Sequence, residues 1–120
     1  MTRRRSPEAQ IQRAIVQHYR QRAAAGVFMF AVPNGGYRRP IEAAILKATG
    51  TVAGIPDTIW IKGGQVFAME LKAPRGRLSD AQLATMAEMR EAGAVVAVAT
   101  GIDEALRKLE NLGLLRGRAS

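Results

Sequence analysis

The chain has 120 residues, a length that fits one domain with a single core. Its 18 Lys and Arg against 10 Asp and Glu give a net charge of +8, which favours a polyanionic partner such as nucleic acid. The chain contains no cysteine, which excludes disulfides and thiolate metal sites, and its single histidine argues against a zinc centre.

The ends of the chain are basic and carry no targeting or membrane-spanning segment. Arg3 to Arg5 are followed by a polar helix rather than an apolar run, and no stretch approaches the ~20 apolar residues that cross a bilayer. We therefore expect a cytoplasmic protein with no membrane partner. Residues 1–120 should form one domain, with flexible basic termini at 1–5 and 116–120.

The first half of the chain predicts a helix, a strand and a short helix. Helix-start and periodicity rules place the first helix at about 7–24, with Ser6 as its N-cap. The apolar run 27–32 predicts a strand, which Pro33 ends. Residues 40–48 predict a short helix with an apolar side that includes Ile41 and Ile45.

Two strand-like runs then flank Gly63-Gly64 and predict a hairpin with a two-residue turn, because both central residues need a positive φ. In this register the two numbers of each facing pair sum to 127, so Asp57 faces Glu70. Side chains alternate along a strand, which puts Lys72 on the face of Glu70. A three-residue loop or a bulge would slip the register and separate the two acids.

The last third predicts a helix from Ser79 to about Ala92, a buried strand at 94–99 and a helix at about 103–111. Ser79 to Gln82 has the pattern of a capping box, and Leu83 with Met86 should face the core. A right-handed crossover should place the last strand parallel to the third. The predicted fold class is α/β, with a mixed sheet flanked by helices in the order α-β-α-β-β-α-β-α.

The facing acids of the hairpin are the main functional signal. Two opposed carboxylates repel unless a cation lies between them, and Mg²⁺ prefers such oxygen ligands together with waters. The backbone carbonyl of Leu71 could supply a further ligand, and Lys72 could act on water or on a phosphate. The alternative is that Asp57 caps a turn while Glu70 and Lys72 form a surface pattern. The apolar residues on the same face favour a site that borders the core.

At this point the chain resembles a known family. The segments Gly54-Ile55-Pro56-Asp57 and Glu70-Leu71-Lys72 are similar to the PD-(D/E)xK nuclease pattern, and the surrounding sequence resembles the small stand-alone, phage-type VRR-NUC members. The resemblance spans nearly the whole chain. It also includes Glu8, Pro33 to Gly36, Gly76-Arg77-Leu78-Ser79 and Gln82.

The resemblance implies a restriction-endonuclease-like fold and Mg²⁺- or Mn²⁺-dependent cleavage of DNA phosphodiester bonds. It implies that Asp57 and Glu70 are metal ligands and that Lys72 is the catalytic lysine. Glu8 matches a first-helix acid of the family and would approach the same metal, although it also suits a helix start. Gln82 would face the active site as well as cap its helix. No organic cofactor is implied.

Basic residues in predicted loops are candidates for binding DNA. Arg75 and Arg77 follow Lys72 closely and could hold phosphates beside the scissile bond. The long connection after the first strand adds three further candidates, each of which could instead belong to a solvated loop. These three are Asn34, Arg38 and Arg39.

Three functions fit the sequence, and the first explains most of it. The first is a metal-dependent DNA endonuclease, structure-selective in the manner of a Holliday-junction resolvase or acting at nicks or flaps, which the resemblance associates with a homodimer and branched DNA. The second is a non-catalytic DNA-binding protein with the nuclease fold. The third is a basic assembly protein, against which the oriented acids argue.

Overall fold

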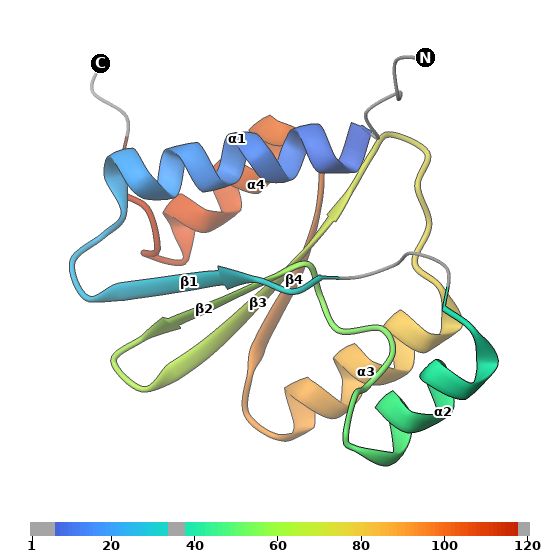
Figure 1. Cartoon of the computed structure of the whole chain (residues 1–120). Helices are drawn as coiled ribbons and strands as arrows, with labels where there is room; N and C mark the ends of the chain where they lie inside the picture. The colour runs from blue at the N-terminus through green and yellow to red at the C-terminus, as the bar shows by residue number, and fades with distance from the viewer. Residues whose placement is uncertain (1–6, 34–37, 118–120) are drawn as a thin grey trace.

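The computed structural model describes residues 7–33 and 38–117 of the chain, and the order of elements predicted from the sequence is confirmed over them (Figure 1). The elements are α1 (Pro7–Arg22), β1 (Val27–Ala31), α2 (Pro40–Ala48), β2 (Thr58–Lys62), β3 (Gln65–Lys72), α3 (Asp80–Glu91), β4 (Val95–Thr100) and α4 (Ile102–Asn111). Ser79 caps α3 as expected.

The four strands form one mixed sheet in the order β1-β2-β3-β4. The pairs β1–β2 and β2–β3 are antiparallel, and β3–β4 is parallel, as the predicted crossover through α3 requires. Helices cover both faces, with α1 and α4 on one side and α3 on the other (Figure 1). The predicted α/β class is therefore confirmed.

The hairpin of β2 and β3 has the predicted turn and register. Gly63 and Gly64 have φ values of +56° and +79°, as a two-residue primed turn requires. Lys62 pairs with Gln65, and every observed partner pair sums to 127. The turn chemistry therefore fixes which residues meet at the far end of the hairpin, where Asp57 and Glu70 lie.

The main core lies between the sheet and the pair α1 and α4. Trp60, Met69 and Leu71 point from the sheet into this layer, where they meet Ile15 of α1 and Leu109 of α4. The indole of Trp60 also donates a hydrogen bond to the hydroxyl of the neighbouring buried Thr58, at 2.9 Å. The start of β2 is thereby anchored one residue after Asp57.

The opposite face of the sheet carries Glu70 and is covered only in part. Met86 and Thr85 of α3 are buried against it. The prediction that Leu83 also faces the core is wrong, because Leu83 is 52% exposed. Gln82, Thr85 and Met86 take the sheet-facing side of α3, and this orientation turns Leu83 toward solvent.

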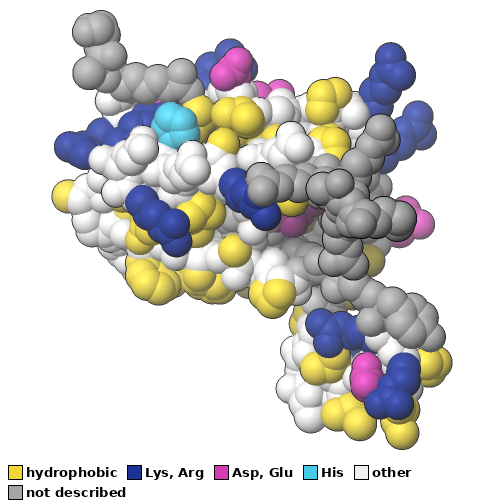
Figure 2. All heavy atoms as spheres, turned by 45° about the horizontal axis from the view of Figure 1, so that its top comes forward, with side chains coloured by type: hydrophobic (Ala, Val, Ile, Leu, Met, Phe, Trp, Pro, Cys, Tyr) yellow, Lys and Arg dark blue, Asp and Glu magenta, His cyan; other side chains and the backbone are white. Residues whose placement is uncertain are grey.

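Helix α2 projects from the body of the fold. None of its residues is buried, and the predicted apolar side remains open, with Ile41 65% and Ile45 57% exposed. Figure 2 shows the region around α2 as a separate lobe at the lower right. The helix is ended locally by Thr49 and Gly50, whose amides donate to carbonyls of its last turn.

The C-terminal segment is tied to the end of α1. The amide of Arg116 donates to the carbonyl of Arg22 at 2.8 Å, and Leu115 forms a bridge with Ala23. The tail that we expected to be free from residue 116 onward is thus fixed at its first residue. Within residues 7–33 and 38–117, none of the helices is long and apolar enough to cross a membrane.

Candidate active site

The N-terminal end of β2 brings Asp57 next to β3. Asp57 lies between the fully buried Pro56 and the first residue of β2, and its carbonyl accepts a hydrogen bond from Val32 at 2.8 Å. Its carboxylate oxygen Oδ2 accepts a hydrogen bond from the amide of Leu71 at 2.9 Å. In a strand the N–H and the C=O of one residue point toward the same neighbouring strand. The carbonyl of Leu71 therefore points to the side on which its amide binds Asp57.

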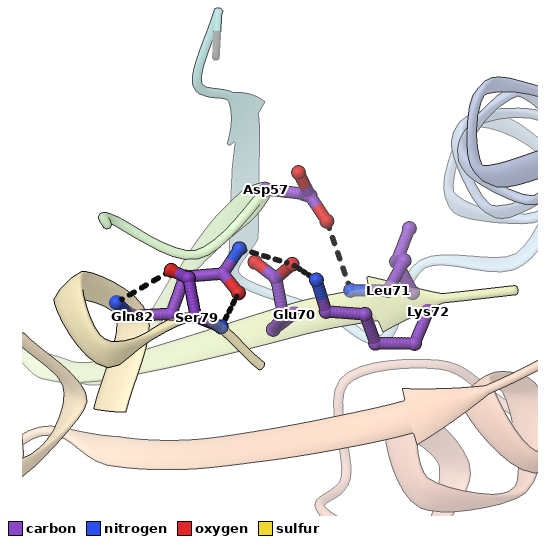
Figure 3. Close-up of polar contacts among 6 residues, drawn as sticks. All are labelled: Asp57, Glu70, Leu71, Lys72, Ser79 and Gln82. Carbon is purple, nitrogen blue, oxygen red and sulfur yellow. Dashed lines mark hydrogen bonds and ion pairs between the residues drawn. The ribbon is translucent and has the colours of Figure 1, made fainter. Parts of the chain in front are cut away.

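Glu70 is buried between two donors that bind the same carboxylate oxygen (Figure 3). Its Oε2 accepts a hydrogen bond from Nε2 of Gln82 at 3.0 Å and lies 3.4 Å from Nζ of Lys72. Its other oxygen, Oε1, is buried and has no hydrogen-bond partner among the described residues. An unpaired buried oxygen is costly, so this atom is the natural position for a ligand.

The ionisation of Glu70 reflects this environment. Burial, the largest cause, and the negative charge of Asp57 together raise the pKa of Glu70 from 4.5 to about 7, although Lys72 acts in the opposite direction. The carboxyl therefore exchanges its proton near neutral pH. A cation between the two acids would favour the ionised form.

Gln82 serves two functions with the two ends of one amide. Its backbone amide donates to Oγ of Ser79 at 3.1 Å, and its Oε1 accepts from the amide of Ser79 at 2.9 Å, which completes the capping box. Because Oε1 is occupied as an acceptor, the NH₂ group must face Glu70. Gln82 thus caps α3 and also binds Glu70, while its catalytic role stays a prediction.

Lys72 is almost fully buried at the end of β3, with 8% exposure. The following loop lies against it, since a Cβ placed on Gly76 would be 3.4 Å from Cδ of Lys72 and 3.0 Å from the carbonyl of Ala73. Burial of a lysine is costly unless its charge is paired, and Glu70 supplies that pairing. The ammonium group is thereby held beside the two acids.

This set of groups fits a divalent cation. Among the described residues no cluster of three or more His, Cys, Asp or Glu side chains could hold a metal, so a site would rest on two carboxylates. Mg²⁺ commonly binds with one or two carboxylates, and its other ligands are waters and substrate oxygens. Asp57, Oε1 of Glu70 and the carbonyl of Leu71 supply such oxygens, and after burial the charge of Asp57 is the next largest cause of the raised pKa of Glu70.

Glu8 lies in the first turn of α1 and is half-buried. Figure 1 shows the start of α1 near the end of β3, and the two elements are in contact. No hydrogen bond or ion pair of the described residues joins Glu8 to Asp57 or Glu70. Its role as a ligand through water stays a prediction.

The loop after β3 presents Arg75 and Arg77 to solvent. The amide of Gly76 donates to the carbonyl of Ala73 at 2.9 Å, which closes a turn with Pro74 second and Arg75 third. Arg75 has φ +69°, a value that this position of a type II turn requires and that normally favours glycine. An arginine retained in a strained conformation points to a role for its side chain.

Arg75→Gly should raise stability while it weakens DNA binding. Relief of the left-handed strain should add about 1 kcal/mol to the free energy of unfolding. The matched control is Arg77→Gly, which removes the same charge from a residue whose φ is not positive, and which should add no stability. Chemical denaturation and salt-dependent DNA binding measure the two effects. An unchanged affinity in both variants would remove this loop from the DNA surface.

The other predicted DNA contacts are less direct. Arg38 is exposed and lies on the loop before α2. Arg39 is also exposed, and its guanidinium binds Glu42 at 2.8 Å, an ion pair that a phosphate could replace at small cost. Asn34 lies outside the described residues.

Two contacts that position the site were not predicted from the sequence. The hydroxyl of Thr85 donates to the carbonyl of Ala53 at 2.6 Å. Gly54 lies so close to α3 that a Cβ there would be 2.4 Å from the carbonyl of Ala81. Together they hold the segment before Asp57 against α3. The sequence motif includes Gly54, and Thr85 lies on the buried side of its helix, but neither residue type identifies its partner.

The comparison with protein families agrees with this geometry. The model of the VRR-NUC domain family matches residues 6–103, which include every predicted catalytic residue. This chain belongs to the VRR-NUC family. The family is one of nuclease domains. Of the residues that carried the resemblance, Lys72 and Gln82 contact Glu70, and Asp57 binds the amide of the adjacent Leu71.

Solved structures with the same fold include two VRR-NUC proteins. One is described as a VRR_NUC domain protein and is 21% identical, with a TM-score of 0.73 over 91% of this chain and 89% of that one. A second, described as a VRR_NUC domain, is 19% identical, with a TM-score of 0.58 over 89% of this chain and 97% of that one. These likenesses confirm the restriction-endonuclease-like fold of this VRR-NUC domain.

A third solved structure is Hjc, a Holliday junction resolvase from Archaeoglobus fulgidus. It is 20% identical, with a TM-score of 0.48 over 78% of this chain and 67% of that one, a likeness too small to support a conclusion about substrate. No curated protein matches the chain.

Proposed function

We propose that this VRR-NUC domain is a DNA endonuclease that hydrolyses phosphodiester bonds and depends on Mg²⁺ or Mn²⁺. The observation that carries the proposal is the unpaired, buried Oε1 of Glu70, which lies in a site with Asp57 and Lys72. Asp57, Glu70 and the Leu71 carbonyl would hold the cation. When bound, the cation would supply positive charge to the phosphate and lower the pKa of a water.

The protein residues then have separate tasks. Gln82 and Lys72 fix the orientation of Glu70 by binding its Oε2, so that Oε1 stays directed into the site. The amide of Leu71 fixes the carboxylate of Asp57 in the same way. Lys72 keeps a positive charge where negative charge develops on the phosphate, and it can orient the attacking water. These contacts exist before substrate arrives, which limits reorganisation during the reaction.

Exposed basic residues would bind the DNA backbone. The excess of Lys and Arg gives the chain a net charge of +8, and Figure 2 shows many basic and few acidic side chains on the face in view. Arg75 and Arg77 are the nearest candidates in sequence to Lys72. A domain of this size has little surface with which to read a long base sequence. We therefore propose selectivity for DNA structure.

A cleavage panel tests the proposed function. Single-stranded, duplex, flap and four-way-junction DNA are incubated with the protein and Mg²⁺, Mn²⁺ or a chelator, and products are separated on a denaturing gel. We expect cleavage with either metal and none with chelator. DNA binding without cleavage under every condition would favour the non-catalytic DNA-binding protein instead.

An exposed apolar patch on β1 and β2 supports the further proposal of a homodimer. Phe28 and Phe30 are 60% and 43% exposed, and their rings lie 6.2 Å apart at the edge of the sheet. Phe28 pairs with Ile61, which is exposed on the same face. Adjacent exposed aromatic residues are typical of interaction surfaces. A second copy of the chain would bury this patch and bring two active sites to one DNA molecule.

Replacement of Phe28 and Phe30 by serine should convert the dimer to a monomer. The serine variant loses the apolar area that would drive association, and sedimentation equilibrium measures the mass in solution. A control in which Ile41 and Ile45 are replaced by serine removes exposed apolar side chains from α2 instead, and it should remain dimeric. A monomeric wild-type protein, or a serine variant that is still dimeric, would contradict the proposal.

A further inference from the structure

A groove lies between α2 and the start of α3, directly beside the candidate active site. Its volume is about 790 Å³, within the roughly 300–1,000 Å³ that pockets for small ligands occupy. One wall includes Ser79 and Gln82, and the other includes Ala43, Leu46 and Lys47 of α2. Because Gln82 also binds Glu70, the groove and the catalytic carboxylate share a residue.

The chemistry of the groove is apolar with a cationic edge. Leu46, Val52 and Ile55 supply apolar surface, while Arg38 and Lys47 supply positive charge. None of the described residues that line the groove is acidic. A nucleotide has the complementary composition, since it joins a flat, weakly polar base to an anionic phosphate.

The two walls of the groove differ in how firmly they are held. The segment at Ala53 and Gly54 is fixed to α3 by the hydroxyl of Thr85 and by close backbone packing. The opposite wall, α2, has no buried residue. A fixed wall beside the active site, faced by a lightly held one, suits a ligand that enters from solvent.

We propose that this groove binds an unpaired nucleotide of the DNA strand whose phosphate lies at Glu70. The inference rests on the proposed nuclease function and narrows its substrate. A base within a duplex is stacked and paired, so it can enter a pocket only when it leaves the helix, at a cost of a few kcal/mol. DNA that already has an unpaired nucleotide beside the cleavage position avoids this cost. Flaps and single-strand to duplex junctions are therefore preferred over continuous duplex.

The test compares binding of two DNA molecules by two tryptophan variants of α2. The probes are a fluorescent blunt duplex and the same duplex with a single-stranded arm, both in EDTA so that no cleavage occurs. Ala43→Trp fills the groove, whereas Ala44→Trp adds the same side chain to an exposed neighbour that does not line it. Ala43→Trp should weaken binding of the armed duplex about tenfold, and Ala44→Trp should leave it unchanged.

The blunt duplex separates this inference from the proposed function. Ala43→Trp should change the affinity for the blunt duplex less than twofold. In separate reactions with Mg²⁺, Ala43→Trp should still cleave the armed duplex at saturating protein concentration. Equal affinity of the wild type for both probes, or equal binding by both tryptophan variants, would overturn the inference and leave the nuclease function standing. If the wild type binds the armed duplex more tightly than the blunt duplex but cleaves no DNA with Mg²⁺ or Mn²⁺, only the proposed nuclease function is overturned. If the tryptophan at position 43 unfolds α2, Lys47→Gln serves as the second variant. It should weaken binding of the armed duplex and leave binding of the blunt duplex unchanged.

Discussion

Asp57→Asn should reduce Mg²⁺-dependent cleavage by about 10³-fold, because a bound metal typically supplies several kcal/mol of transition-state stabilisation. The substitution preserves the shape of the side chain and keeps an oxygen that can accept the hydrogen bond from Leu71. It removes the charge that opposes Glu70 and attracts the cation. The fold should therefore persist while metal affinity falls, which calorimetric titration with Mn²⁺ can measure beside the cleavage rate.

A matched control for this prediction is Asp80→Asn. Asp80 is an exposed acid in the first turn of α3, so the change in net charge is the same and the site is untouched. Cleavage by this variant should equal that of the wild type. DNA affinity in chelator should be retained by both variants, since neither residue is proposed to bind phosphate. Wild-type cleavage by Asp57→Asn would refute the metal site.

The geometry of the acids could be predicted because it follows from local chemistry. A Gly-Gly pair sets the turn, the turn sets the register, and the register places Asp57 opposite Glu70. The position of Gln82 at the start of α3 could be predicted for the same reason, since the capping box is a pattern of neighbouring residues. In both cases the determining residues lie within one hairpin or one helical turn.

Features that depend on tertiary packing could not be predicted from such local patterns. The sequence pattern of α3 suggested that Leu83 faces the core, but the contact between Gly54 and Ala81 rotates a different side of the helix toward the sheet. The groove beside α2 depends on where a helix with no buried residue comes to lie. The unpaired oxygen of Glu70 likewise depends on Gln82 and Lys72 both binding the other oxygen.

Glu70→Gln should stabilise the metal-free protein at pH 8. The folded-state pKa of Glu70 is raised from 4.5 to about 7, so the folded state binds its proton more tightly than the unfolded state. The resulting stability is fully present below pH 4.5 and is lost as pH rises through 7. The raised pKa already includes the attraction to Lys72, so at pH 8 the ionised carboxylate costs the wild type up to about 3 kcal/mol even beside that lysine, and the neutral amide avoids this cost. Near pH 4.5 the two proteins should have similar free energies of unfolding.

Added Mg²⁺ should make the wild type more stable than Glu70→Gln at pH 8. The cost of the ionised Glu70 would then be linked to metal binding. Mg²⁺ that binds only the folded wild type raises its free energy of unfolding in proportion to the logarithm of metal concentration, whereas Glu70→Gln has lost a ligand and should respond weakly. Urea denaturation at pH 5 and pH 8, with EDTA or with Mg²⁺, measures both effects. Glu91→Gln, an exposed substitution on α3, controls for the loss of a negative charge. A Glu70→Gln protein less stable than the wild type at pH 8 in EDTA would show that the buried carboxylate is stabilised by its neighbours, and the need for a cation would disappear.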